Sequence, residues 1–103
     1  MPRGSSTTLG RDDALTRAAT TLRPRFLERR RRDVASIRAA LECGDFETID
    51  RLGHNLRGNG LSFGFPEMSA IGERLEVAAV AKNAIAVLEE LALLETCLLR
   101  IDA

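Results

Sequence analysis

Residues 45–64 read DFETIDRLGHNLRGNGLSFG. Apolar residues recur every three or four positions through this stretch, which is the periodicity of an amphipathic α-helix. The residues that share this apolar face are Phe46, Ile49, Leu52, Leu56 and Phe63. Asp45 stands where it can cap the first turn, and Gly64 ends the pattern. The stretch therefore predicts one helix with a continuous buried stripe.

The segments on both sides show the same helical periodicity, and none alternates with the period of a strand. The helices that we expect are a short one ending near Leu22, a second from Pro24 to Gly44, the one quoted above, a fourth that opens at Pro66, and a last one capped by Asn83, from Ala84 to about Ile101. This order predicts an all-α fold, an up-and-down four-helix bundle with an additional short N-terminal helix.

Two regions of this bundle stand apart by composition. Residues 1–10 are rich in Gly, Ser and Thr and have no periodicity, which predicts a flexible N-terminal arm before a helical bundle over residues 11–103. The last helix carries a wide apolar arc, which contact with two neighbouring helices or with another molecule would bury, and the contact within the bundle is favoured. An Asn59-Gly60 pair interrupts an otherwise strong helical pattern and needs a packing or functional reason.

Composition excludes several classes of protein. A chain of 103 residues is one domain, and its 45% hydrophobic and 29% charged residues are enough for a packed core. Two Cys and one His argue against a disulfide framework and against a zinc site, so we expect no metal and no cofactor. No membrane-spanning run and no signal-peptide pattern is present, so we expect a cytoplasmic protein without membrane contact.

Charge is balanced overall but uneven along the chain. Lys+Arg and Asp+Glu each total 15, which argues against nucleic acid as a partner. The basic excess lies before residue 39 and includes the run Arg29-Arg30-Arg31-Arg32. This run is either a docking patch for an acidic partner or a solvated helix face. The second interpretation is favoured because four consecutive helical positions point in four directions.

The single histidine lies on the helix of residues 45–64. At 100° per residue, His54 falls about 140° from Ile49, so we expect its side chain to face water. Arg57, three residues later, places a permanent cation within reach of a group attached to the ring. Asp50, four residues earlier, lies near enough to orient the ring. An exposed imidazole beside a cation can accept a phosphoryl group on nitrogen, and we expect the outer ring nitrogen to carry it.

Two glycines and a leucine near His54 are each interpreted separately. Gly58 removes the side chain that would most obstruct access to the imidazole. Gly60 lies on the inner face and lets a neighbouring helix approach closely. Leu61 adds an exposed apolar residue, which suits a docking surface.

The run His54-Asn55-Leu56-Arg57-Gly58, followed by Gly64, resembles the signature of histidine phosphotransfer (HPt) domains. The resemblance covers about Leu22 to Leu99 and implies a helical bundle that acts as a phosphocarrier, not as a kinase with its own ATP site. It implies that His54 accepts phosphate from the aspartate of a response-regulator receiver domain and passes it to another receiver. It further implies that Arg57 stabilises the phosphoryl group and that Mg²⁺ belongs to the receiver.

The partners implied are receiver domains, including those of hybrid sensor kinases, and we expect the protein to be a monomer. The residues expected at the receiver-binding surface are Asp50, Arg51, Gly58, Leu61 and Ser62. Phe65-Pro66 follow the closing glycine where the family often has small residues, which leaves the shape of that turn open.

Other interpretations remain open. The dimerisation helix of a sensor kinase would have a Thr-Pro pair where Gly58-Asn59 stand here. A helical adaptor would keep the bundle and transfer nothing, with His54 as an ordinary surface residue. A nucleic-acid binder would use the arginine run and show steep salt dependence.

Overall fold

The computed structural model consists of four helices, α1 (Pro2–Glu42), α2 (Phe46–Ser62), α3 (Pro66–Val80) and α4 (Ala84–Asp102). The structure describes the backbone of residues 2–102 and the side chains of residues 22–101. Residues 2–102 contain no strand, so the predicted all-α class is confirmed. Within these residues, none of the helices combines the length and apolarity needed to cross a membrane.

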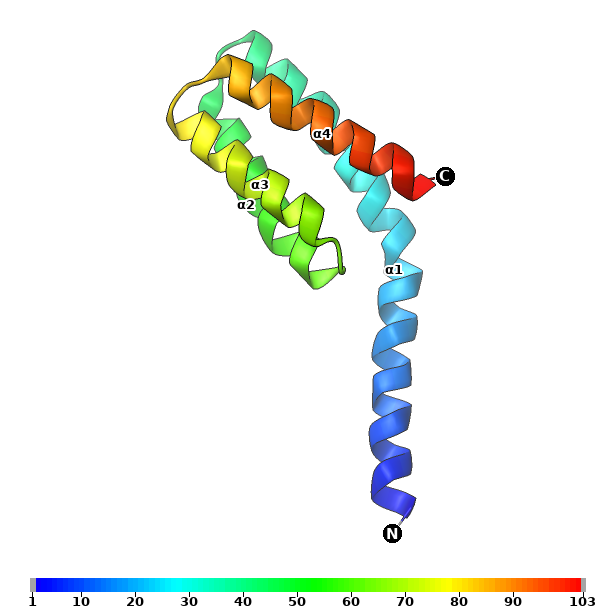
Figure 1. Cartoon of the computed structure of the whole chain (residues 1–103). Coiled ribbons are helices and arrows are strands. Elements are labelled where there is room, and N and C mark those ends of the chain that lie inside the picture. The colour runs from blue at the N-terminus through cyan, green and yellow to red at the C-terminus, as the bar shows by residue number, and fades with distance from the viewer. Residues whose placement is uncertain (1, 103) are drawn as a thin grey trace.

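The helices pack as a four-membered ring (Figure 1). α1 contacts α2 and α4, and α3 contacts the same two helices. Each connection is short, so consecutive helices run in opposite directions. The order along the chain and the packing together make an up-and-down bundle, as the periodicity predicts.

A separate short N-terminal helix is not shown. α1 runs as one helix of 41 residues with Pro24 inside it, although the sequence predicts a new helix starting there. Proline lacks one hydrogen-bond donor and is costly inside a helix, but it does not end this one. The predicted arm over residues 1–10 belongs to the segment whose side chains lie outside the described residues, so the domain boundary at residue 11 stays a prediction.

The turns follow the predicted signals. Gly44 and Gly64 adopt positive φ angles of 69° and 81°, which suit glycine after a helix. Asp45 caps α2 by accepting a hydrogen bond from the N–H of Thr48 at 3.1 Å. Asn83 caps α4 in the same way, accepting from the N–H of Ala86 at 3.1 Å. The predicted starts of α2 and α4 are therefore confirmed.

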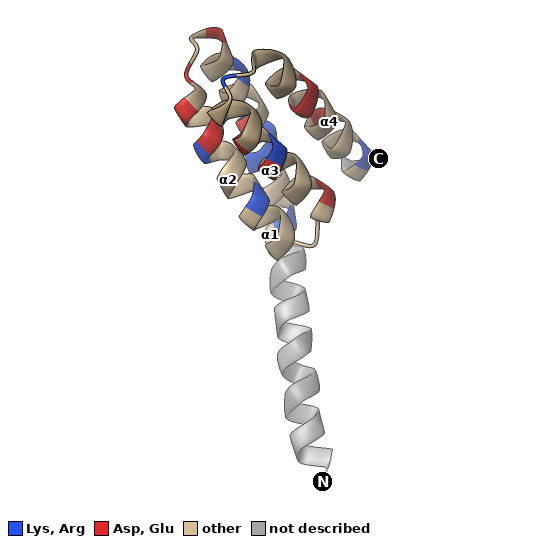
Figure 2. Ribbon diagram, turned by 60° about the vertical axis from the view of Figure 1, so that its left-hand side comes forward, with Lys and Arg blue, Asp and Glu red and all other residues tan. Residues whose placement is uncertain are grey.

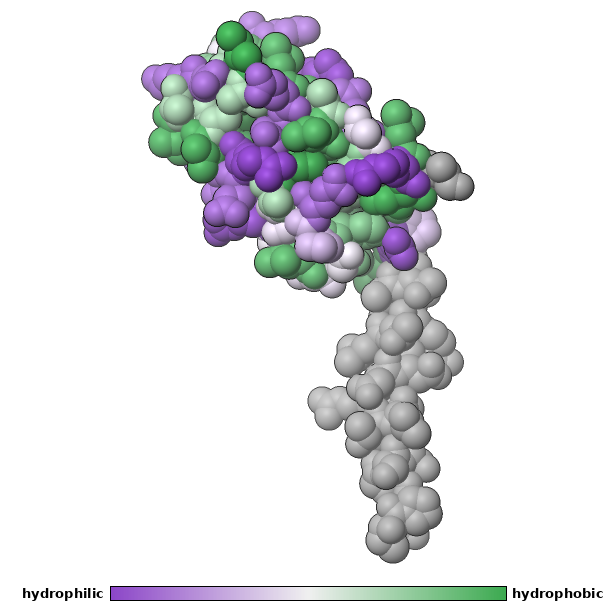
Figure 3. Space-filling view, viewed as in Figure 1, coloured by the Kyte–Doolittle hydropathy of each residue, from purple (hydrophilic) through white to green (hydrophobic). Residues whose placement is uncertain are grey.

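All four helices contribute to the core. Its fully buried side chains are Ile37, Ile49, Leu56, Met68, Ile71, Leu75, Val87, Leu91 and Leu94. The apolar arc of α4 is only partly covered by α1 and α3, because Ile85, Leu88 and Leu99 remain exposed. Figure 3 shows such exposed hydrophobic side chains interspersed with hydrophilic ones.

Glycines set the distance between α2 and α3. A Cβ on Gly60 would lie 2.7 Å from the backbone nitrogen of Ser69, so the predicted close approach at Gly60 is confirmed. Gly53 of α2 and Gly72 of α3 face each other, and a Cβ on Gly53 would lie 2.9 Å from the carbonyl oxygen of Gly72. Real Cβ atoms do not tolerate such contacts. These glycines therefore allow the α2 and α3 backbones to pack closer than any side chain would permit.

The arginine run is exposed at three positions and buried at one. Arg29, Arg31 and Arg32 are exposed, in agreement with a solvated helix face. Arg30 is only 3% exposed, so this interpretation is wrong for that residue. One of four consecutive positions on α1 must face the bundle. Arg30 occupies that position, and its side chain lies on the side of α1 that faces α2.

Candidate functional site

His54 projects from the middle of α2 into solvent. Its side chain is 64% exposed, as the helical periodicity predicts. Ile49 and Leu56, on the opposite side of the same helix, are fully buried in the core. The amphipathic pattern of α2 thus holds the imidazole at the surface while the helix itself is anchored below it.

A carboxylate from α3 meets the imidazole. Oε2 of Glu76 lies 3.4 Å from Nδ1 of His54, and Oε1 lies 3.4 Å from Nη1 of Arg57. The Glu76 side chain is 19% exposed, and its Oε1 accepts no hydrogen bond from the described residues. One carboxylate therefore lies between the imidazole and the guanidinium and faces both.

This contact indicates which ring nitrogen of His54 is free. An ionised carboxylate can only accept hydrogen bonds, so we assign the ring proton to Nδ1, which faces Glu76. In this tautomer Nε2 keeps its lone pair. The prediction that the outer ring nitrogen is the reactive one stays a prediction.

Asp50 does not orient the ring in the way the sequence predicts. No hydrogen bond joins Asp50 to His54 among the described residues, and the carboxylate that contacts the ring comes from Glu76 instead. Asp50 and His54 do line a common open hollow of about 530 Å³, together with Arg51 and Glu76. The reason is geometric, since the ring leans toward α3, across the close contact between the two helices.

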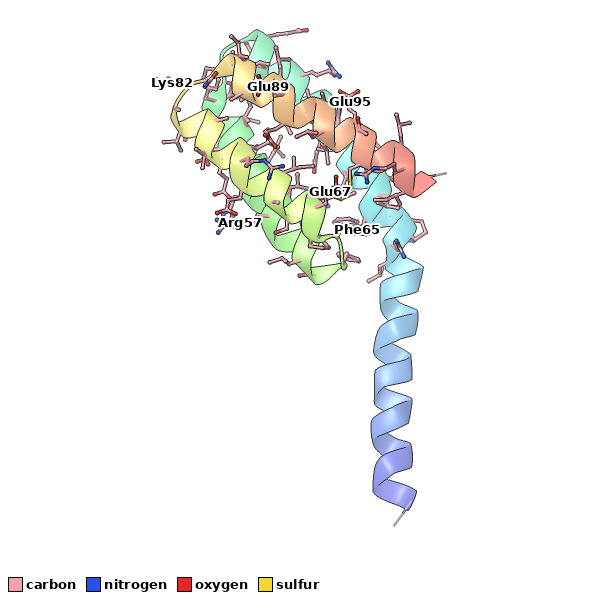
Figure 4. The ribbon with its side chains drawn as sticks, in the orientation of Figure 1. Arg57, Phe65, Glu67, Lys82, Glu89 and Glu95 are labelled. Atoms are coloured by element: carbon pink, nitrogen blue, oxygen red, sulfur yellow. The ribbon has the colours of Figure 1, made fainter. Side chains whose placement is uncertain are left out.

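Arg57 lies on the outer side of the α2–α3 pair (Figure 4). It contacts the same Glu76 carboxylate as His54. Its side chain is 45% exposed and is held by the ion pair with Glu76. Figure 2 shows that basic and acidic residues are interspersed over α2 and α3. Arg57 is thus placed to contact an anionic group on His54 without being buried itself.

The remaining residues expected at the receiver-binding surface are also accessible. A Cβ on Gly58 would meet nothing within 4 Å, so this side of His54 is open. Leu61 is 65% exposed. Ser62 is exposed, and its hydroxyl donates to the carbonyl oxygen of Gly58 at 3.2 Å. All three residues are thus exposed on α2, as His54 is.

Asp45 also lines the hollow that contains His54. A hydrogen bond from the Thr48 hydroxyl, at 2.6 Å, and a second one from the Thr48 N–H lower the pKa of the Asp45 carboxyl below its ordinary value. Asp45 therefore stays ionised and adds negative charge at the start of α2, where the helix dipole favours it.

The described residues include no group of three or more His, Cys, Asp or Glu side chains that could hold a metal ion. His54 and Glu76 alone supply two donors of the kinds that metals use, which is fewer than a protein metal site normally needs. The site consists of an exposed imidazole, a carboxylate that lies 3.4 Å from it and a guanidinium that lies 3.4 Å from the same carboxylate.

Glu76 is the site residue that sequence reasoning missed. Its spacing places it on α3, next to the buried Leu75, but no local pattern indicates that α3 packs with this register against His54. The glycines Gly53 and Gly72 carry the only signal, because they permit the two helices to meet one turn away from the site.

A family model described as Hpt domain matches residues 21–103 of the chain. No curated protein and no solved structure matches it.

Proposed function

The chain belongs to the Hpt domain family, and we propose that it is a phosphorelay intermediate whose His54 accepts a phosphoryl group from the phospho-aspartate of one receiver domain and passes it to another. Domains of this family are phosphocarrier modules of two-component phosphorelays and interact with receiver domains. We propose in addition that His54 is the residue that carries the phosphoryl group, and that one receiver domain donates this group and another accepts it.

One observation carries the proposal. His54 is exposed, and Nδ1 faces the Glu76 carboxylate at 3.4 Å, which directs the lone pair of Nε2 to solvent. In the proposed step, Nε2 attacks phosphorus while the bond between phosphorus and the aspartyl oxygen breaks. The electron pair of the broken bond leaves on the receiver's carboxylate.

The product ring is cationic, since it carries the phosphoryl group on Nε2 and keeps its proton on Nδ1. The Glu76 carboxylate offsets this charge from behind, and Arg57 supports the phosphoryl oxygens from the side. Transfer to the next receiver reverses the step, with the aspartate of that receiver as the nucleophile. Mg²⁺ is supplied by the receiver in this scheme.

We further propose that Asp50, Arg51, Gly58, Leu61 and Ser62 form the receiver-binding surface. The open space at Gly58 and the exposure of Leu61 support it, since a docked domain needs clearance and apolar area beside the imidazole. The proposal includes receivers of hybrid sensor kinases as donors, a monomeric protein, a cytoplasmic location, and no role for nucleic acid.

The decisive experiment is transfer from a radiolabelled phospho-receiver to the purified protein, compared with His54→Gln. We expect label on the wild-type chain and none on the variant. We expect the variant to fold, because His54 is exposed and contributes little to the core. Far-UV circular dichroism checks this. Label that persists on His54→Gln, or a wild-type chain that accepts none from a full panel of receivers, refutes the proposal and favours a helical adaptor.

A further inference from the structure

A second hollow, of about 310 Å³, lies between α1 and α2. His54 is not among the residues that line it. Its charged lining residues are Arg25, Arg29, Arg30 and Asp33 of α1 and Arg51 of α2. Four guanidinium groups therefore meet one carboxylate, and we call this hollow the arginine groove. Of these residues only Arg51 belongs to the proposed receiver-binding surface, and the proposed phosphotransfer uses none of the others.

Arg30 is the unusual member of the arginine groove. Its side chain is 3% exposed, and the guanidinium carbon lies 5.0 Å over the ring of Phe26. Nε lies 2.9 Å from Oδ2 of Asp33, but the two groups are not aligned for a hydrogen bond. Nη1 is buried and has no hydrogen-bond partner among the side chains and backbone that the structure describes.

Burial opposes the charge of both members of this pair. It lowers the pKa of Arg30, which Asp33 only partly offsets, and it raises the pKa of Asp33, which Arg30 only partly offsets. A buried guanidinium with an unpaired N–H group is costly unless an anion meets it. Arg30 therefore adds positive charge to the lining of the groove that Asp33 only partly offsets, which favours an anion in the groove.

Three further arginines of the groove form no ion pair within 4 Å in the part of the chain that the structure describes. These are Arg25, Arg29 and Arg51, although Arg29 acts on Asp33 and Arg51 acts on Asp45 at longer range. Elsewhere in the bundle, each of the following arginines is paired with a glutamate: Arg32, Arg38, Arg57, Arg74 and Arg100. The groove thus brings together three arginines without an ion pair and one, Arg30, that is paired with Asp33.

Apolar and amide groups complete the lining. Phe26 and Phe63 stack with ring centroids 4.5 Å apart, and Leu52 lies beside them. Asn55 and Asn59 add amide groups from successive turns of α2. Guanidinium groups match the geometry of phosphate oxygens, and an aromatic wall suits a flat organic group.

We propose that the arginine groove binds a small phosphate ester, with the phosphate on the arginines and a planar, apolar organic group against Phe63 and Leu52. Its volume falls at the lower end of the range of small-molecule sites. A small ligand is favoured over a protein surface because the guanidinium groups line a hollow of small-molecule size. This proposal does not depend on phosphotransfer at His54.

Phenyl phosphate is the probe that tests this, titrated into the full chain and followed by two-dimensional ¹H–¹⁵N NMR. We expect shifts of Asn55, Asn59 and the arginine Nε–H groups of the groove, with a Kd in the millimolar range or tighter. The Arg25→Gln/Arg29→Gln double variant should bind at least about tenfold more weakly. Both side chains are exposed, so the fold is retained.

Arg32→Gln is the matched control, because Arg32 belongs to the same arginine run but pairs with Glu28 outside the groove. It should bind phenyl phosphate like the wild type. The absence of shifts in the groove, or an equal loss of binding in Arg32→Gln, overturns the proposal. The proposal is also overturned if inorganic phosphate binds as tightly as phenyl phosphate, because the aromatic ring then contributes nothing. It is overturned likewise if benzyl alcohol binds as tightly, because the phosphate then contributes nothing.

Discussion

Replacing Gly72 by alanine should separate α2 from α3. The new Cβ would lie 2.5 Å from the backbone nitrogen of Arg57 and 2.6 Å from the carbonyl oxygen of Gly53. Both contacts are with backbone atoms, so no side-chain rotation relieves them. An ordinary contact requires about 1 Å more, and the two helices must move apart to provide it.

The expected cost follows from two opposing effects. Overpacking of this kind costs about 1–3 kcal/mol or more, whereas alanine gains about 1 kcal/mol over glycine inside a helix. Gly58→Ala is the matched control, because a Cβ there meets nothing within 4 Å and only the helix propensity changes. We expect Gly58→Ala to be more stable than the wild type and Gly72→Ala to be less stable. The propensity gain is common to both variants, so the difference between them is the overpacking cost of about 1–3 kcal/mol or more.

Urea unfolding followed by far-UV circular dichroism measures this difference. A Gly72→Ala protein as stable as Gly58→Ala would refute the claim that glycine sets the helix spacing. The reasoning also predicts a functional effect, because Arg57 and Glu76 lie on either side of the contact. Under conditions in which Gly72→Ala remains folded, phosphotransfer to His54 should be slower than in the wild type.

Four further predictions concern the site itself. Arg57→Ala should slow phosphotransfer about fivefold, the effect of about 1 kcal/mol, because it removes the cation beside the phosphoryl group; an unchanged transfer rate and phosphohistidine lifetime would count against this role. Glu76→Gln should slow transfer by a similar factor while thermal unfolding changes little, since its ion pairs are partly exposed; equal rates would exclude Glu76 as a positioning residue. Gly58→Leu should keep its helicity and lose receiver binding in a pull-down or calorimetric titration, and normal transfer by the folded variant would refute the clearance argument. The folded pKa of Asp45 lies below the ordinary value of 3.8, so its cap stabilises α2 fully above that pH and is lost as the pH falls through the lower folded value; unfolding curves of Asp45→Asn should lack this acid dependence.

Local signals were sufficient to predict most of the fold. The caps at Asp45 and Asn83 and the helix-ending glycines Gly44 and Gly64 act within a few residues of themselves, so the sequence alone reveals them. The exposure of His54 also follows from periodicity, because a helix that buries Ile49 must turn His54 outward. Pro24 was read too strongly, since a proline weakens a helix without necessarily ending it.

The contacts between helices could not be predicted in this way. The burial of Arg30 depends on how α1 rotates against α2, and the contact between Glu76 and His54 depends on the register of α3 against α2. Neither rotation nor register leaves a periodic trace in one sequence. Helix spacing indicates Asp50 as the carboxylate nearest the ring because both residues lie on α2, whereas the carboxylate in contact belongs to Glu76, 22 positions away along the chain.

The glycines connect the fold to the chemistry. Gly53 precedes His54 directly, and Gly72 stands one helical turn before Glu76, so a close approach of the two backbones lies next to the site. A glutamate side chain is short, and from a more distant helix it could not face both His54 and Arg57 at 3.4 Å. Glycines that weaken both helices by propensity are thus what allows α3 to supply a carboxylate to an imidazole on α2, and a bundle with alanine at these positions would have to position its histidine in another way.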